Sequence, residues 1–198
     1  MIEDIKEKAL KEGVPIIKDE GLIFLLNLIK ENNYKDILEL GTAVGYSSME
    51  MAKLDKDIHI DTLEKNIDMY NQAIKNIEDN NLNNQIEVHF GPIEEYKTDK
   101  MYDLIFVDAA KAQYKKYTEQ FFDNLKDDGV FVYDNMIFHG MIYDVANIKN
   151  RNTRSLVKKL LIFREFMIND EHFDIMFHDD VGDGILVASK NKLWKKKM

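Results

Sequence analysis

The stretch Ile37-Leu-Glu-Leu-Gly41-Thr-Ala-Val-Gly45-Tyr-Ser-Ser48 decides the fold. Four residues that suit a buried strand lead into a turn with two glycines, and a helical pattern begins at Tyr46. A strand that enters a helix through such a turn lets backbone amides approach a ligand closely. The stretch therefore predicts an α/β fold with a nucleoside cofactor at this loop.

Apolar runs typical of buried strands recur along the chain, and helical patterns separate most of them. We predict strands over 37–40, 58–63, 86–90, 104–107, 130–133, 173–177 and 185–188, and helices over 22–30, 46–54, 66–80 and 113–125 after a short leading helix. This alternation predicts a seven-stranded, mostly parallel sheet with helices on both faces. The last two runs are joined by the turn 179–184, so we expect an antiparallel C-terminal hairpin at one edge.

Length and composition bound the class of protein. With 198 residues, 45% of them hydrophobic, we expect a single domain over 1–198, with N-terminal helices within 1–31 and a frayed tail over 190–198. The absence of cysteine excludes disulfides, thiolate zinc sites and cysteine nucleophiles. The net charge of −9 disfavours indiscriminate nucleic-acid binding. Without a signal peptide or a membrane-spanning run, we expect a cytoplasmic protein and no membrane partner.

Glu64 is the acidic partner of the glycine loop. It ends the second apolar run, 23 positions after Gly41, where an acid accepts hydrogen bonds from ribose hydroxyls. The alternative is an ordinary turn, with Glu64 capping the next helix. The glycine loop and Glu64 occur together at this spacing, which favours a cofactor site. Ala43 stands where a dinucleotide loop needs glycine, which argues against an NAD-linked dehydrogenase.

Polar residues follow two neighbouring apolar runs at the point where each run ends. Asp108 comes directly after one run, and the pair Asp134-Asn135 comes directly after the next. The carboxyl ends of parallel strands form the ligand crevice of an open sheet, and carboxylate and amide oxygens suit hard cations. Taken alone, the pair Asp134-Asn135 is also typical of a strand-end turn. Together the three residues indicate a site for a metal or a substrate.

These motifs resemble a known family. The segments 38–47 and 106–111, with Glu64 and Asp134-Asn135, closely resemble the class I S-adenosylmethionine-dependent O-methyltransferases that require a divalent metal, over nearly the whole chain. Within that group the chain looks most similar to the bacterial tRNA 5-hydroxyuridine methyltransferases. The segments that recur there are 14–16, 109–114, 151–154 and 181–184. The catechol and caffeoyl-CoA methyltransferases look like cousins.

The resemblance implies a Rossmann-like fold, S-adenosylmethionine and a Mg²⁺ or Mn²⁺ ion. It implies cofactor contacts at Ile17, Glu39, Gly41, Ser47, Glu64, Ile93 and Asp108, and metal ligands at Asp108, Asp134 and Asn135. One departure concerns adenine: Pro92 stands where the family carries an acid, so the backbone of Ile93 or the carboxylate of Glu94 would replace that contact.

A methyltransferase of this kind needs a base for the acceptor hydroxyl. Lys111, three residues beyond Asp108, is the candidate, and we expect these two residues to form the catalytic pair. The alternative is that Lys111 is a solvated residue that opens the next helix. Methyl transfer from sulfonium to oxygen is a direct displacement, so the protein supplies alignment and charge stabilisation.

A basic stretch bears on the identity of the substrate. Arg151 and Arg154 belong to the one dense basic stretch, and we expect them to contact the anticodon loop of a tRNA, whose 5-hydroxyuridine would become 5-methoxyuridine. The alternative for that stretch is a solvated helix face. Two other functions remain open: an O-methyltransferase of small catechol-like or caffeoyl-CoA-like molecules, and a cofactor-binding protein without catalysis. The resemblance also favours a homodimer.

Overall fold

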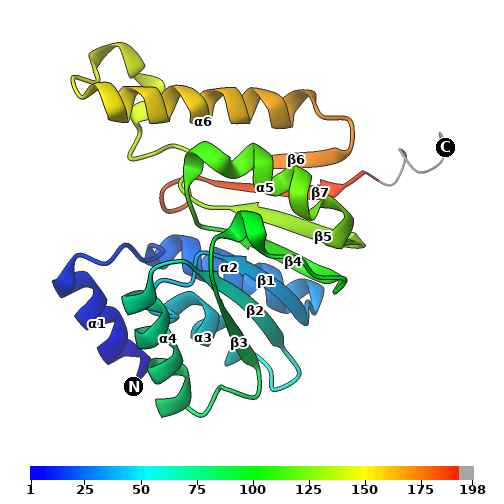
Figure 1. The fold of residues 1–198 in the computed structure, drawn as a ribbon. Helices are drawn as coiled ribbons and strands as arrows, with labels where there is room; N and C mark the ends of the chain where they lie inside the picture. Colours follow the sequence, from blue (N-terminus) through cyan, green and yellow to red (C-terminus); the bar gives the residue numbers. More distant parts are fainter. Residues whose placement is uncertain (192–198) are drawn as a thin grey trace.

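A seven-stranded sheet with the order β3-β2-β1-β4-β5-β7-β6 forms the centre of the molecule (Figure 1). The computed structural model describes residues 1–191. The strands are β1 (Asp36–Leu40), β2 (His59–Glu64), β3 (Ile86–Phe90), β4 (Tyr102–Val107), β5 (Leu125–Tyr133), β6 (Phe173–His178) and β7 (Ile185–Lys190). The strands β1 to β5 run parallel, and β7 runs antiparallel to its neighbours β5 and β6. The predicted fold class is confirmed.

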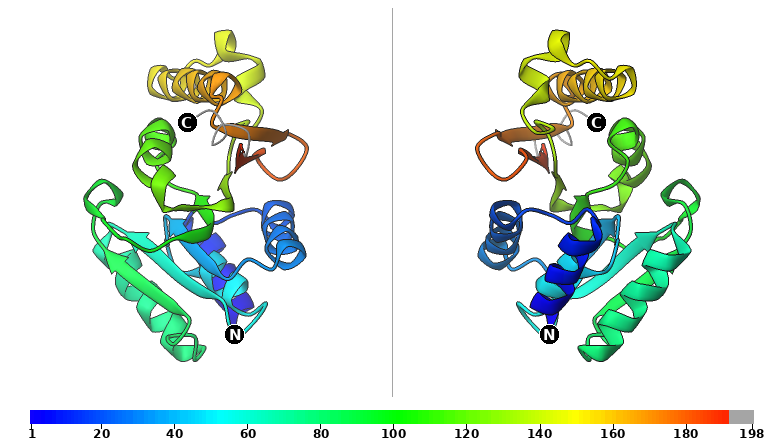
Figure 2. Two further views of the ribbon diagram at one scale, coloured as in Figure 1. Left: turned by 90° about the vertical axis from the view of Figure 1, so that its right-hand side faces the viewer. Right: turned by 90° about the vertical axis from the view of Figure 1, so that its left-hand side faces the viewer.

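Helices cover both faces of the sheet. The α-helices are α1 (Ile2–Glu12), α2 (Asp19–Asn32), α3 (Tyr46–Ala52), α4 (Ile67–Asp79), α5 (Tyr114–Phe121) and α6 (Arg151–Asn169). Short 3₁₀ helices, labelled η1 (Ile93–Glu95), η2 (Lys111–Gln113), η3 (Phe122–Asn124), η4 (Met141–Tyr143) and η5 (Val145–Asn147), lie in the connections. The views in Figure 2 show α1 to α4 on one side of the twisted sheet and α5 with α6 on the other. No helix within residues 1–191 has both the length and the apolar character needed to cross a bilayer.

The central strands read as unbroken apolar runs because both of their faces are buried. In β4, Leu104 and Phe106 pack with α1 to α3, whereas Ile105 and Val107 pack with α5 and α6, and all four are fully buried. Side chains alternate across a strand, so two cores form on one sheet. This double burial fixes the register and so the positions of the residues that follow each strand.

Two predicted boundaries differ from the structure. The helix predicted over 113–125 ends at Phe121, and β5 begins at Leu125 rather than at Val130. The polar residues at 126–128 look like a loop, but the pairing of β5 with β4 begins at Leu125 and shifts register before Val130. A side chain at Gly129 would lie 2.9 Å from the Asp103 carbonyl oxygen, so glycine permits this close irregular pairing.

The two ends of the chain follow the predictions in part. The helices α1 and α2 occupy the segment predicted to hold N-terminal helices. The predicted frayed tail starts at Lys190, but this residue instead ends β7. Asn191, the next residue of that predicted tail, donates from its backbone amide to the His172 carbonyl oxygen at 2.8 Å, and 192–198 lie outside the described residues.

Candidate active site

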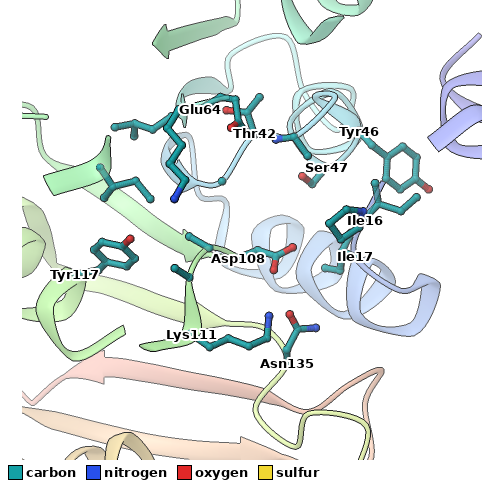
Figure 3. Close-up of a pocket in the computed structure, with 18 of the residues that line it drawn as sticks. Ile16, Ile17, Thr42, Tyr46, Ser47, Glu64, Asp108, Lys111, Tyr117 and Asn135 are labelled. Atoms are coloured by element: carbon teal, nitrogen blue, oxygen red, sulfur yellow. Dashed lines mark hydrogen bonds between the residues drawn. The ribbon is translucent and has the colours of Figure 1, made fainter. Parts of the chain in front are cut away.

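The carboxyl ends of β1, β2 and β4 open onto a cavity of about 600 Å³. Its wall also includes the segment between α1 and α2 and the loop that follows β5. Figure 3 shows Glu64 and Thr42 across the cavity from Asp108, with Lys111 and Asn135 next to each other beside Asp108. The cavity volume falls within the range of small-molecule sites. The structure therefore brings the predicted cofactor loop and the predicted catalytic residues to one place.

Gly41 lies where the cofactor loop contacts the residues that follow β4. Its φ of 112° lies in the region that favours glycine, and a Cβ there would lie 2.3 Å from the backbone oxygen of Asp108. Any side chain at position 41 would therefore push the end of β4 away from the cofactor loop. Glycine is required here for contact between two strand ends as well as for ligand approach.

Glu64 is held in place by the loop that it faces. Its Oε2 accepts a hydrogen bond from the Ala43 amide at 2.9 Å, and its Oε1 accepts one from the Asn66 amide at 2.7 Å. Ala43 has a φ of 47°, a left-handed conformation. A carboxylate has about four acceptor positions, so two remain for hydroxyl donors from the cavity. This geometry suits the recognition of ribose hydroxyls.

Glu39 lies beneath the loop rather than in the cavity. It is fully buried, and its carboxylate accepts hydrogen bonds from the hydroxyls of Ser47, Ser48 and Thr62. Ser47, in contrast, lines the cavity. The carboxylate of Glu39 therefore fixes the first turn of α3 and the middle of β2 relative to β1. Any effect of Glu39 on the cofactor acts through these neighbours.

Glu39 also predicts a pH dependence of stability. Burial raises the pKa of its carboxyl from 4.5 to about 7, although three hydroxyl donors act to lower it. The folded state then retains a proton that the unfolded chain releases above pH 4.5, so the free energy of unfolding falls by about 3 kcal/mol between pH 4.5 and 7. Glu39→Gln removes this slope. Urea unfolding of both proteins at several pH values measures it, and a constant difference between them would contradict the assignment.

Ile17 and Ile93 both line the cavity. Ile17 is buried in the segment between α1 and α2 and lines the cavity. Ile93 begins η1, and its carbonyl oxygen accepts a hydrogen bond from the Gln120 amide at 2.9 Å. Glu94 and Tyr117 line the same end of the cavity. Burial, followed by the charge of Glu94, raises the pKa of Tyr117 to about 12, so the two side chains interact at this end of the cavity.

The three predicted metal ligands meet where β4 and β5 end. Asp108 and Asn135 line the cavity, and Asp134 lies behind them at 2% exposure. The backbone amide of Asn135 donates to Asp134 Oδ1 at 2.6 Å. Asn135 adopts a left-handed φ of 59°, which asparagine tolerates. Burial raises the pKa of Asp108 and of Asp134, and their mutual repulsion raises that of Asp134 further. Two acids that oppose each other's charge favour a cation between them.

Lys111 faces this acidic pair. It begins η2, directly after the loop that follows β4, and its side chain lines the cavity. The ammonium lies 5.8 Å from the centre of the Phe138 ring, and its charge opposes the larger effect of burial, which raises the pKa of Asp108. In Figure 3 the Lys111 amine lies next to the Asn135 side chain. The amine is therefore within the same chamber as the predicted ligands.

Asp183 is a fourth acid at the cavity, and the sequence alone did not predict it as a site residue. It lies in the turn between β6 and β7, is 2% exposed and lines the cavity. Its Oδ1 accepts a hydrogen bond from the His139 amide at 2.6 Å, and the Lys18 ammonium lies 3.7 Å from the same oxygen. The glycines around Asp183 indicated only a turn. An acid between two glycines near the last strand was the signal available.

A compact acidic group elsewhere must be distinguished from this site. Within residues 1–191, the group of three acid or histidine side chains whose ligand atoms lie within 4.8 Å of one another is Asp61, Glu87 and His89. The Lys100 ammonium already bonds Asp61 at 2.9 and 3.0 Å. The Lys100 ammonium therefore already pairs with this group, and Asp61 and Glu87 line a separate pocket.

Known proteins that resemble this chain agree with the cofactor loop and the polar residues of the cavity. The O-methyltransferase family model matches residues 1–191. The chain belongs to the O-methyltransferase family. It is accordingly an S-adenosylmethionine-dependent O-methyltransferase. This result excludes the NAD-linked dehydrogenase and the cofactor-binding protein without catalysis.

Individual relatives of this O-methyltransferase extend the comparison. Caffeoyl-CoA O-methyltransferase 2 of Petunia hybrida is 37% identical over 188 residues, which are 87% of this chain and 74% of the relative. A Staphylococcus aureus structure, provisionally described as a caffeoyl-CoA O-methyltransferase, has a TM-score of 0.92 at 38% identity, over 96% of this chain and 92% of that one. An O-methyltransferase of Bacillus cereus in complex with SAH shares the fold, with a TM-score of 0.80 at 24% identity, over 96% and 90%.

The predicted RNA contacts lie away from the cavity wall. Arg151 is exposed at the start of α6. Arg154 turns back toward its own chain, where its Nε donates to the Ile148 carbonyl oxygen at 2.8 Å. Its guanidinium therefore holds the loop before α6, which leaves Arg151 as the freer of the two cations.

Proposed function

We propose that this O-methyltransferase methylates one of two adjacent oxygens on a small catechol-like aromatic, with a divalent cation. The observation that carries the proposal is the meeting of Asp108, Asn135 and Lys111 at the wall of a cavity that also contains the cofactor loop. A donor site and an acceptor site within one chamber permit direct transfer.

On the donor side, we propose that the glycine loop and Glu64 hold S-adenosylmethionine. Glu64 would accept from the ribose hydroxyls with the oxygen positions that Ala43 and Asn66 leave open. Ile17 and Ser47 would contact the methionine portion, and Ile93 the adenine. These contacts would exclude water from the sulfonium and hold the cofactor beside Asp108.

On the acceptor side, Asp108, Asp134 and Asn135 would hold Mg²⁺ or Mn²⁺. Two observations fit such a group: the ligands are all oxygens, and no donor within residues 1–191 hydrogen-bonds the Asp108 carboxylate. When bound, the cation holds neighbouring oxygens and eases the loss of a hydroxyl proton. The Lys111 amine would receive that proton. The acceptor oxygen then bonds the methyl carbon as the bond from carbon to sulfur breaks, which leaves S-adenosylhomocysteine.

The relatives support a small aromatic acceptor. The Petunia hybrida relative is a caffeoyl-CoA O-methyltransferase, and caffeoyl groups carry two adjacent hydroxyls. The tRNA 5-hydroxyuridine prediction gains no support from these relatives. It stays a prediction that rests on two basic side chains at the start of α6: Arg151 is exposed, whereas Arg154 is half-buried and bonds the Ile148 carbonyl oxygen.

Competition between acceptors tests the proposal. We expect methylation of catechol and of caffeoyl-CoA with Mg²⁺, and no measurable transfer to a 5-hydroxyuridine anticodon stem-loop. Arg151→Ala should leave kcat/KM for catechol unchanged, because Arg151 does not line the cavity. Transfer to the stem-loop with a higher kcat/KM than to either aromatic, reduced by Arg151→Ala, would instead establish the RNA function.

A further inference from the structure

Asp183 has a buried oxygen with no partner. Within residues 1–191, its Oδ2 is the buried side-chain nitrogen or oxygen that lacks a hydrogen bond. A buried polar atom without a partner is unfavourable, and more so when it is charged. The carboxylate lines the cavity, so a ligand there can supply the missing donor.

The chain holds this carboxylate rigidly beside the proposed metal ligands. The backbone of the β6–β7 turn bonds the loop after β5: the Ile137 amide donates to the Asp183 carbonyl oxygen at 3.0 Å, and the Met136 amide donates to the Gly184 carbonyl oxygen at 2.8 Å. A Cβ at Gly184 would lie 2.8 Å from the Ile137 nitrogen, so the contact is close. Asn135 begins this loop, and Asp183 is therefore fixed relative to it.

The position of Asp183 does not suit direct coordination of one ion together with Asp108 and Asp134. Ligand atoms on one Mg²⁺ ion lie within about 4.2 Å of one another, twice the metal–oxygen distance. Asp108, Asp134 and Asp183 do not form a group of this compactness in the described part of the chain. Mg²⁺ retains several waters when few protein ligands reach it. A water on the cation is the donor that fits between the ion and Asp183.

We propose that Asp183 is a positioning residue of the metal centre, whose Oδ2 accepts a hydrogen bond from a water on the cation held by Asp108, Asp134 and Asn135. The proposal rests on the proposed function. It assigns a use to a residue 48 positions from Asn135 in the sequence. It uses the oxygen of Asp183 that has no hydrogen-bond partner, since the His139 amide and the Lys18 ammonium approach Oδ1.

Mn²⁺ binding without substrate tests the proposal, by calorimetry and by the electron paramagnetic resonance of free Mn²⁺. Asp183→Asn preserves the shape and an acceptor for the His139 amide. We expect a 10- to 100-fold weaker Mn²⁺ affinity, the usual cost of losing an outer partner. Asp180→Asn removes the same charge from an exposed position in the same turn and should change the affinity less than twofold. S-adenosylmethionine binding, expected within twofold for both variants, confirms folding.

Several outcomes would overturn the proposal. The first is an Asp183→Asn protein that binds S-adenosylmethionine normally and binds Mn²⁺ within twofold of the unaltered chain. The second is a raised KM for catechol as the sole effect of Asp183→Asn, because that result would assign Oδ2 to the substrate. Lys18→Met tests whether Asp183 acts only as the partner of the Lys18 ammonium. This change should not weaken Mn²⁺ binding, and a weakening equal to that of Asp183→Asn would overturn the proposal. Absence of Mn²⁺ binding by the unaltered chain would overturn both this proposal and the proposed function.

Discussion

Lys111→Met should reduce kcat for methyl transfer by about 10²- to 10⁴-fold, the usual contribution of a positioned general base. Methionine retains most of the apolar stem but lacks the amine that lies 5.8 Å from the centre of the Phe138 ring, so it cannot accept a proton. S-adenosylmethionine affinity should change less than twofold, because the proposed cofactor contacts lie across the cavity. Single-turnover kinetics with a catechol and direct cofactor titration measure the two effects.

Two further variants separate proton transfer from charge. Lys111→Arg keeps a cation but supplies no neutral amine, so it should be as impaired as Lys111→Met. Lys115→Met is the matched control, because the Lys115 ammonium also lies over a ring, 4.5 Å from the centre of Phe166, but does not line the cavity. A Lys111→Arg protein with a tenth or more of normal activity would show that the lysine acts through its charge.

Asp134→Asn should weaken Mn²⁺ binding and methyl transfer by more than about 100-fold, beyond the loss expected for an outer partner. The same change should stabilise the metal-free protein above neutral pH. Burial raises the pKa of Asp134, so in the metal-free folded state its ionisation is unfavourable, and stability falls as the pH rises through the range between the unfolded and folded pKa values.

Thermal unfolding with and without Mn²⁺ measures both consequences of Asp134→Asn. The unaltered chain should gain Tm when the ion is added, because a ligand that binds only the folded state stabilises it. The variant should begin with a higher Tm at pH 8 and gain little from the ion. Asp123→Asn, at an exposed position on η3, is the control and should behave as the unaltered chain. A normal ion-induced gain in Asp134→Asn would remove Asp134 from the ligand set.

The sequence was sufficient to predict the residues that follow strands. Asp108, Asp134 and Gly41 each stand directly after an apolar run, and a parallel sheet carries such residues to one edge whatever the details of the loops. Lys111 lines the same cavity because it opens the short helix that follows Asp108. The cofactor, metal and base assignments for individual residues remain predictions, as do the homodimer and the single domain.

Other features depended on contacts between distant segments. Asp183 comes to the cavity only because β7 inserts between β5 and β6, which no local pattern specifies. Glu39 occupies a strand position next to the loop, but the three hydroxyls that bury its charge come from two other elements. Arg154 looked free in the sequence, whereas the loop before α6 supplies it with a carbonyl acceptor. In each case the deciding partner is a tertiary contact.

Metal dependence of methyl transfer to a catechol tests the central claim most directly. The purified chain, S-adenosylmethionine and catechol should give the singly methylated product with Mg²⁺. The rate should fall more than about 100-fold with a chelator and return when Mg²⁺ is restored. A phenol of similar size with one hydroxyl should not react. Equal rates with and without the chelator, or equal transfer to the phenol, would contradict the account.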